Sequence, residues 1–527
     1  MIQFPDLIRK YAAATPDRKA LHFEGRDYSW AQFNDRVHRM AQALIGLGVG
    51  VGDRVAYLGQ NSHWLVETYF TPCMIGAIAA PINFRLSEAE MVEVIADCTP
   101  EVLIVDRHFT ERAAALMELC PSLKHLILAD WDAPGDDLPA GTMSYDAVIE
   151  AMPPVPNDAF RDRASQSDDT MILFYTSGTT GVPKGVMLSH SNLLVNATGS
   201  GHLYGFRQDD VLLLSGPMFH LGTGSRVYTA LCYGATMVVQ SKFEVDETME
   251  MIQSQGITTM TLVPTMLRMI LDHPEFGRFD FSSIRCLTYG AAPMPVTLME
   301  RALRVIPGIT FCQGYGMTET SPVLAVLPPA DHMPGSPMLV KLASVGKPAI
   351  YCDLRIVDEN DQPVPMGQSG EIIVRGPQVM NGYWNRPEDT AHAMRGGFYH
   401  TGDAGYLDED GYLFLVGRTK EMIISGGENV YPIETENALS KHPAVAQCAV
   451  LGLPHPHWGE EVHAVVALHP GQSVTAEALI AHCRDLIATT RHRAGSRCGP
   501  RRCRCRPPTR STRTRSSAPC WRLGNDQ

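Results

Sequence analysis

The chain has 527 residues, of which 45% are hydrophobic and 19% charged, and this length predicts at least two domains. Its formal net charge is −13, although eleven arginines and one acid follow residue 490, so the rest of the chain is more acidic still. Such a charge disfavours nucleic acid as the principal partner. No secretory signal or integral membrane segment is expected, and the thirteen irregularly spaced cysteines do not indicate a disulfide framework, so we expect a cytoplasmic protein.

Strand-like runs alternate with helical patterns over the first 330 residues. The strands are expected at Arg54–Leu58, Glu101–Val105, Leu126–Leu128, Met171–Tyr175, Val211–Leu214, Ala235–Gln240 and Ile309–Cys312. Helices are expected at Trp30–Leu47, with Ser29 as N-cap, and at Met294–Val305. This alternation favours an α/β architecture of parallel sheets covered by helices.

The pattern changes after about Ser344. Three strands without helix-length inserts, Leu354–Val357, Glu371–Val374 and Tyr412–Val416, indicate a small antiparallel sheet or barrel. A compact α+β segment then follows, with a helix from Pro432 to Ser440, strands Val445–Leu453 and Glu461–Leu468, and a helix Thr475–Ala488. We therefore expect an N-terminal domain at 1–416, a hinge at 417–421, a C-terminal domain at 422–490 and a tail at 491–527.

One loop has the composition of a phosphate-binding segment. It follows an apolar strand and contains Thr176, Ser177, Gly178, Thr179, Thr180, Gly181 and Lys184. Glycines let a backbone approach phosphate closely, hydroxyls donate hydrogen bonds, and a lysine supplies a point charge. The spacing is not that of a Walker A loop, because Gly181 precedes Lys184 by three residues and Gly185 follows it.

This loop resembles the signature loop of the adenylate-forming superfamily, and further motifs of that superfamily follow in its usual order. They are Pro217-Met218-Phe219-His220, Tyr289-Gly290-Ala291-Ala292-Pro293, Gln313-Gly314-Tyr315-Gly316-Met317-Thr318-Glu319, Tyr399-His400-Thr401-Gly402-Asp403 and Gly417-Arg418-Thr419-Lys420. Each string is short, but their joint occurrence in order identifies the chain as similar to acyl-CoA synthetases. The implied fold is a large N-terminal domain of helix-covered sheets with a small β-barrel-like subdomain, and a small mobile α+β C-terminal domain.

The resemblance implies ATP, Mg²⁺ and coenzyme A as reaction partners, and it assigns residues to them. Thr176 and Glu319 would hold Mg²⁺, and Lys184 would contact the phosphates together with the loop. Residues implied on the adenine side are Gly290, Ala291, Ala292, Pro293, Gln313, Gly314, Tyr315, Gly316, Met317 and Thr318. Asp403 would accept hydrogen bonds from the ribose hydroxyls, and Arg418 would contact the ribose or phosphate region. His220 would lie near the acyl substrate, Lys420 would be the hinge, and Gly426 and Gly427 would approach the pantetheine arm of CoA.

The expected reaction is the activation of a carboxylic acid as its acyl-AMP, followed by transfer of the acyl group to CoA. A medium- or long-chain fatty acid is the expected substrate, because Val263-Pro264-Thr265-Met266-Leu267 and Tyr289–Met294 resemble fatty acyl-CoA synthetases. An oxidase of the luciferase kind, a standalone adenylation domain and a nucleotide-binding pseudoenzyme are the rival interpretations, and a homodimer is left open.

The C-terminal tail departs from the superfamily pattern. Members carry a late lysine that reaches the α-phosphate, whereas this chain has no lysine after Lys441. From Arg491 onward there is no Ile, Val, Met, Phe or Tyr, so disorder is expected. A shifted reading frame, a basic tail for anionic partners, and a metal cluster of Cys498, Cys503, Cys505 and Cys520 are the three explanations considered. The missing lysine predicts impaired adenylation.

Overall fold

The structure is a computed structural model that describes residues 2–131, 138–160, 162–163, 166–176, 183–290, 294–333, 336–425, 428–456, 459–491, 504–506 and 522–524. Its contacts divide the chain into two units, each described by itself. The first unit contains Met1–Asp353 and Arg375–Gly397, and the second contains Leu354–Val374 and Phe398–Gln527. None of the described helices is long and apolar enough to cross a membrane.

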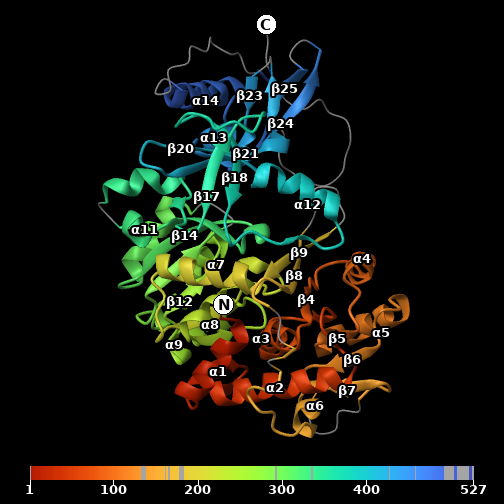
Figure 1. The fold of residues 1–527 in the computed structure, drawn as a ribbon. Coiled ribbons are helices and arrows are strands. Elements are labelled where there is room, and N and C mark those ends of the chain that lie inside the picture. The colour runs from red at the N-terminus through yellow and green to blue at the C-terminus, as the bar shows by residue number, and fades with distance from the viewer. Residues whose placement is uncertain are drawn as a thin grey trace. The chain divides into compact units, whose positions relative to one another are not determined.

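The first unit contains two large sheets (Figure 1). One has the spatial order β16 (Lys347–Pro348), β15 (Val323–Leu327), β14 (Thr310–Gly316), β13 (Cys286–Tyr289), β12 (Thr259–Thr261), β10 (Val211–Leu214), β11 (Thr236–Val239), β1 (Lys19–Phe23) and β2 (Arg26–Ser29). The other has the order β19 (Gly382–Tyr383), β9 (Lys184–Ser189), β8 (Thr170–Thr176), β4 (Ile78–Ile82), β3 (Arg54–Leu58), β5 (Val102–Val105), β6 (His125–Leu128) and β7 (Thr142–Ser144).

The central strands of both sheets pair in parallel, as the strand–helix alternation predicts. The sheet edges differ, because β8 and β9 form an antiparallel pair, as do β14 and β15. Only a short connection joins the strands of each pair, too short for a crossover helix, so these neighbours reverse direction. The antiparallel edges were not predicted from the sequence.

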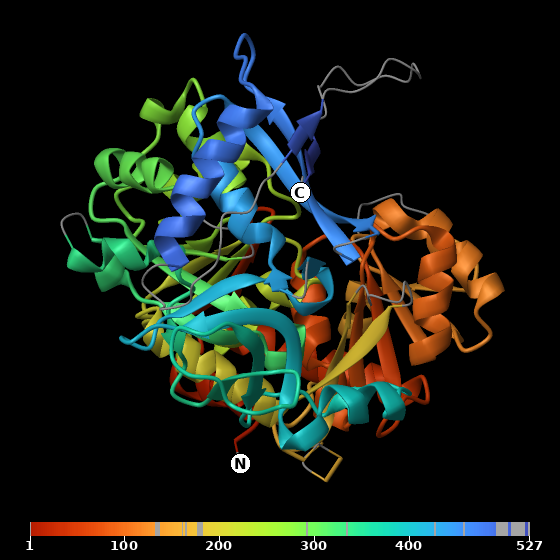
Figure 2. The same cartoon turned by 90° about the horizontal axis from the view of Figure 1, so that it is seen from above.

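Helices flank the two sheets. They are α1 (Phe4–Ala14), α2 (Trp30–Gly46), α3 (His63–Phe70), α4 (Glu88–Cys98), α5 (Thr110–Leu119), α6 (Tyr145–Ala151), α7 (His190–Leu203), α8 (Leu221–Tyr233), α9 (Val245–Gln255), α10 (Pro264–Asp272), α11 (Val296–Val305) and α12 (Pro387–Ala393). Figure 2 shows α4 and α5 (orange) along one side of their sheet, and their Ile95 and Leu116 belong to one buried hydrophobic cluster with Leu103 of β5. The expected cap of α2 is confirmed, since the Ser29 side chain accepts the Gln32 N–H in a capping box.

The second unit contains two smaller sheets and two helices. The first sheet has the order β17 (Asp353–Val357), β18 (Gly370–Arg375), β20 (Tyr399–Leu407) and β21 (Leu413–Arg418). The other has the order β23 (Glu428–Val430), β22 (Ile423–Ser425), β25 (Gly459–Leu468) and β24 (Val445–His455). The helices are α13 (Pro432–Ser440) and α14 (Ala476–Arg491), and their Leu439 and Leu479 belong to one buried hydrophobic cluster with Val466 of β25. A mixed α/β chain with a large sheet-rich part and a smaller C-terminal part is therefore confirmed.

The proposed hinge, 417–421, lies within the second unit and comprises the last two residues of β21 and the 3-10 turn Thr419–Glu421 that precedes β22. Its use as a hinge, and the domain boundary at 416, stay predictions. Most of the tail falls outside the described residues. Within its described part, the strands β26 (Arg504–Arg506) and β27 (Arg522–Gly524) are assigned.

A buried histidine begins α7 and has a consequence for stability. The His190 side chain is fully buried, its ring lies 5.8 Å from that of Phe4, and neither ring nitrogen has a hydrogen-bond partner. Desolvation lowers the pKa of His190 to about 4, only partly opposed by the charge of Asp6. The folded state therefore holds a neutral imidazole at a pH where the unfolded chain would bind a proton.

We expect the first unit to lose stability as pH falls from about 6.5 to about 4, because the unfolded state binds more protons across that window. His190 alone contributes about 3 kcal/mol of this loss. His190→Phe should keep the packing against Phe4 and flatten the pH dependence of the thermal unfolding midpoint. His202→Gln, an exposed position on the same helix, is the control. An unchanged pH profile in His190→Phe would contradict the assignment.

Candidate functional site

The hairpin of β8 and β9 carries both ends of the hydroxyl-rich loop. Thr176, the last residue of β8, pairs with Lys184, the first residue of β9. The strand register thus holds these two predicted site residues side by side. The loop residues Ser177, Gly178, Thr179, Thr180 and Gly181 lie outside the described residues.

Lys184 is held by two side chains from the segment around β19 and α12. Its Nζ lies 3.0 Å from Oδ2 of Asp389 and 5.1 Å from the ring centroid of Tyr383. The lysine side chain is 19% exposed, whereas that of Asp389 is 44% exposed. The ammonium group is therefore positioned by an ion pair and a cation–π contact while still reaching solvent.

Glu319 contacts the hydroxyl of the same tyrosine, whose ring face contacts Lys184. It belongs to a 3-10 turn, Thr318–Thr320, that follows β14. The Tyr383 hydroxyl donates a hydrogen bond to Oε1 of Glu319 at 3.0 Å, and the Met380 N–H donates to the Glu319 carbonyl at 2.9 Å. Tyr383 pairs with Val186 of β9, so the structure brings Thr176, Lys184 and Glu319 to one region. A carboxylate and a hydroxyl are oxygen ligands of the kind that Mg²⁺ accepts alongside water and phosphate.

Two asparagines on one face of α7 hold the segments that carry Glu319 and Tyr383. The Asn196 amide donates to the carbonyls of Thr320 and Val323, both at 2.9 Å. One turn earlier, the Asn192 amide donates to the carbonyls of Pro377 and Val379, both at 2.8 Å. These buried amides tie the turn that carries Glu319 and the segment leading to β19 to the same helix, so the two segments share one support.

The predicted adenine-side residues lie at the ends of β13 and along β14. A Cβ atom at Gly290 would lie 2.7 Å from the carbonyl oxygen of Gly314, and one at Gly316 would overlap the Pro322 carbonyl. The Gln313 side chain is 7% exposed, and its Oε1 is a buried acceptor without a partner. Such an acceptor costs free energy unless a ligand or water supplies a donor, which fits a binding surface.

The other residues predicted on the adenine side differ in burial, and some of them are not described. Tyr315 and Thr318 are buried, Met317 is half-buried and accepts the Thr320 N–H through its carbonyl, and Ala291, Ala292 and Pro293 lie outside the described residues. Residues 313–316 belong to β14, which extends beyond the strand expected to end at Cys312. Pairing with β15 explains the extension, because Gln313 and Gly314 face Leu327 and Val326.

His220 is the N-cap of α8. Its Nδ1 accepts the Gly222 N–H at 3.0 Å, so a neutral ring carries its proton on Nε2. Partial desolvation lowers the pKa of His220, although its side chain is exposed. The preceding loop is fixed by Asn61, whose Oδ1 accepts the Met218 N–H at 2.8 Å and whose amide donates to the Gly216 carbonyl at 2.7 Å. His220 thus has a capping role, which the sequence did not indicate.

The second unit holds the remaining predicted residues. Asp403 on β20 pairs with Arg418 on β21, and Nε of Arg418 lies 2.8 Å from Oδ1 of Asp403. Asp403 is buried, and its N–H donates to the Thr401 hydroxyl at 3.0 Å. Lys420 is exposed in the 3-10 turn Thr419–Glu421, whereas Gly426 and Gly427 lie outside the described residues.

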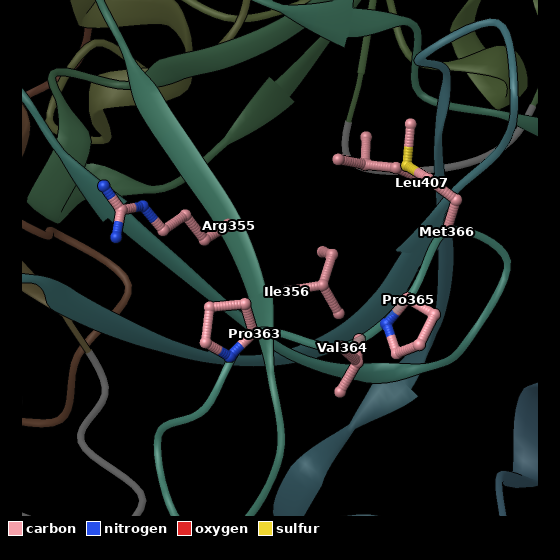
Figure 3. Close-up of a pocket in the computed structure, with 7 residues that line it drawn as sticks. All are labelled: Arg355, Ile356, Pro363, Val364, Pro365, Met366 and Leu407. Atoms are coloured by element: carbon pink, nitrogen blue, oxygen red, sulfur yellow. The ribbon is translucent and has the colours of Figure 1, made fainter.

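A small pocket in the second unit is separate from these residues. It has a volume of about 180 Å³ and is lined by Arg355, Ile356, Pro363, Val364, Pro365, Met366 and Leu407. Figure 3 shows the aliphatic and proline side chains grouped together, with Arg355 extending away from them. No predicted site residue lines this pocket, so we assign it no substrate.

Sequence reasoning missed the residues that position the site. Tyr383 and Asp389 follow Lys184 by about two hundred residues, and no local pattern connects them to it. Asn192 and Asn196 did leave a signal, because residues four apart lie on the same face of a helix.

Comparison with known proteins places this geometry in a family. A family model described as "AMP-binding enzyme" matches residues 8–384, and one described as "AMP-binding enzyme C-terminal domain" matches residues 434–511. The chain is 39% identical over 477 residues to an indoleacetate–CoA ligase of Aromatoleum aromaticum, and 38% identical over 481 residues to a feruloyl-CoA synthase of an Amycolatopsis species. The first alignment covers 90% of each chain; the second covers 90% of this chain and 91% of its relative.

A comparison with a solved structure agrees with this family assignment. The o-succinylbenzoate–CoA synthetase of Bacillus subtilis, in complex with its acyl-adenylate intermediate, matches with a TM-score of 0.75 and 31% identity. The match covers 92% of both chains.

The close approach of β13 to β14 leads to a testable expectation. Gly290→Ala should lower the free energy of unfolding by about 1–3 kcal/mol, because the added methyl group would overlap the Gly314 carbonyl. Urea unfolding measures the change. Gly277→Ala is the matched control, since a Cβ atom there meets nothing within 4 Å, and equal stabilities of the two variants would contradict the packing described.

Proposed function

This chain belongs to the AMP-binding enzyme family and is an ATP-dependent acid–CoA ligase, and on that basis we propose that its substrate is a carboxylic acid with an aromatic ring. Acid–CoA ligases of this family form AMP and use ATP and CoA with the acid. The proposal on the acid is supported by the substrates named for three relatives. Indoleacetate, ferulate and o-succinylbenzoate all carry a ring and a carboxylate.

The first half-reaction requires the acid's carboxylate to attack the α-phosphorus of ATP, with pyrophosphate leaving. Both reactants are anions, so catalysis consists mainly of positioning and charge neutralisation. Lys184 is proposed to contact the leaving phosphates, and Thr176 and Glu319 to hold Mg²⁺. The metal ion, when bound, would neutralise phosphate charge. The observation that supports this arrangement is the placement of the Lys184 ammonium and the Glu319 carboxylate around Tyr383.

We propose separate roles in nucleoside binding for Gln313 and for Asp403. Gln313 offers a buried acceptor to the base. Asp403 would accept hydrogen bonds from the ribose hydroxyls, and its contact with Arg418 orients the carboxylate. In the second half-reaction the CoA thiol attacks the acyl carbonyl and AMP leaves. Lys420 is proposed as the hinge of the rearrangement between the steps, with Gly426 and Gly427 near the pantetheine arm.

A fatty acid of medium or long chain is the second candidate substrate. The segments Val263–Leu267 and Tyr289–Met294 favour it by their resemblance to fatty acyl-CoA synthetases. His220 is proposed to lie near the acyl group with either substrate. We also propose a homodimer, without assigning any residue to its interface.

A panel of carboxylic acids tests the substrate. We expect AMP release with ATP and CoA to be highest for aryl and arylalkanoic acids, and at least tenfold lower for octanoate and palmitate. Lys184→Ala should lower kcat/KM for every acid, because it removes a preorganised charge. The control for background ATP hydrolysis is the reaction without acid. The reverse order of preference would favour the fatty-acid candidate, and no AMP with any acid would favour a nucleotide-binding pseudoenzyme.

The absence of a lysine after Lys441 leads to a further prediction. The C-terminal family model extends to residue 511, yet between Lys441 and that residue the chain offers arginines and no lysine. Pyrophosphate release should rise about 10²- to 10³-fold when the tail is replaced by a lysine-bearing terminus, because one preorganised charge contributes a factor of that order. CoA-dependent consumption of supplied acyl-AMP should change little. Equal pyrophosphate release by the two proteins would refute the impairment.

A further inference from the structure

We propose that Tyr383 and Asp389 are positioning residues that hold Lys184 and Glu319 apart, so that both remain available to a magnesium–nucleotide complex. The inference rests on the proposed function of Lys184 and Glu319. It concerns side chains that contact neither the reacting carboxylate nor the α-phosphorus in the proposal.

Lys184 and Glu319 carry opposite charges in the same region. Two such groups would otherwise be free to form a direct ion pair, which would neutralise both before a ligand arrived. In the structure each has a different contact. The ammonium lies 3.0 Å from Asp389 and over the face of Tyr383, whereas the carboxylate accepts the Tyr383 hydroxyl at 3.0 Å.

The tyrosine contacts the two charged groups through different parts of its side chain. Lys184 contacts the π face, where the electrostatic potential is negative, and Glu319 contacts the hydroxyl, which is a donor. One rigid side chain therefore contacts the positive group with its ring face and the negative group with its hydroxyl. Phenylalanine would keep the face and lose the donor, so the two functions can be separated by a single substitution.

The backbone around Tyr383 is fixed independently of these charges. Its N–H donates to the Thr390 hydroxyl of α12 at 2.9 Å, and the Trp384 N–H donates to the Gly185 carbonyl at 2.7 Å. The side chain is 9% exposed. Since α12 also carries Asp389, one short segment supplies both groups that hold Lys184, and β19 anchors that segment to β9.

Isothermal titration calorimetry with magnesium–ATP, and with AMP in the absence of metal, tests the role of Tyr383. We expect Tyr383→Phe to raise the Kd for magnesium–ATP by about three- to tenfold, since a hydrogen bond to a charged group is lost. The Kd for AMP should stay within twofold, because AMP lacks the β- and γ-phosphates. Tyr233→Phe is the control, as it removes a hydroxyl that donates to Thr198 elsewhere in the first unit.

Asp389→Asn tests the other contact and does not threaten folding, because this carboxylate is well exposed. We expect a two- to fivefold higher Kd for magnesium–ATP, again with AMP unaffected. A lower Kd would show that Asp389 competes with the nucleotide for Lys184 and would overturn the positioning role. An unchanged Kd in Tyr383→Phe, with its thermal unfolding midpoint preserved, would overturn the role of the hydroxyl. Should the unsubstituted protein not bind magnesium–ATP, the proposed function itself would fail.

Discussion

The separation of Lys184 from Glu319 is the constraint on which the rest of the site depends. A reaction between a carboxylate and a triphosphate needs positive charge that is not already neutralised. The chain meets this need by pairing Lys184 with the well-exposed carboxylate of Asp389, an ion pair that solvent screens and weakens, while Glu319 accepts the Tyr383 hydroxyl.

The fold supports this separation through elements that are distant in sequence. The antiparallel β8–β9 hairpin places Thr176 beside Lys184, and β19 adds Tyr383 to the edge of the same sheet. Buried amides of α7 then hold the turn that carries Glu319. Because a strand register and a helix face are both rigid, the charged groups inherit positions that a surface loop alone would not fix.

Sequence predicts the parts of this arrangement that are locally encoded. The strand Arg54–Leu58 and the helix Pro432–Ser440 have the predicted bounds, and Ser29 caps α2, because an apolar run, a helix-opening proline and a capping box are each written within a few residues. The antiparallel direction of β9 and the extension of β14 follow from pairing with partners, so they escaped prediction. Tyr383 and Asp389 escaped for the same reason, as did the capping role of His220, which depends on where α8 begins.

The two half-reactions place different demands on the charges that this chain provides. Adenylation joins two anions and gains from every cation near the phosphates, whereas thioester formation removes AMP from an uncharged carbonyl and needs fewer. The described first unit carries Lys184, which is proposed to contact the phosphates, and no lysine follows Lys441. We therefore propose that the missing charge bears mainly on the first step, so that pyrophosphate release is lowered more than thioester formation.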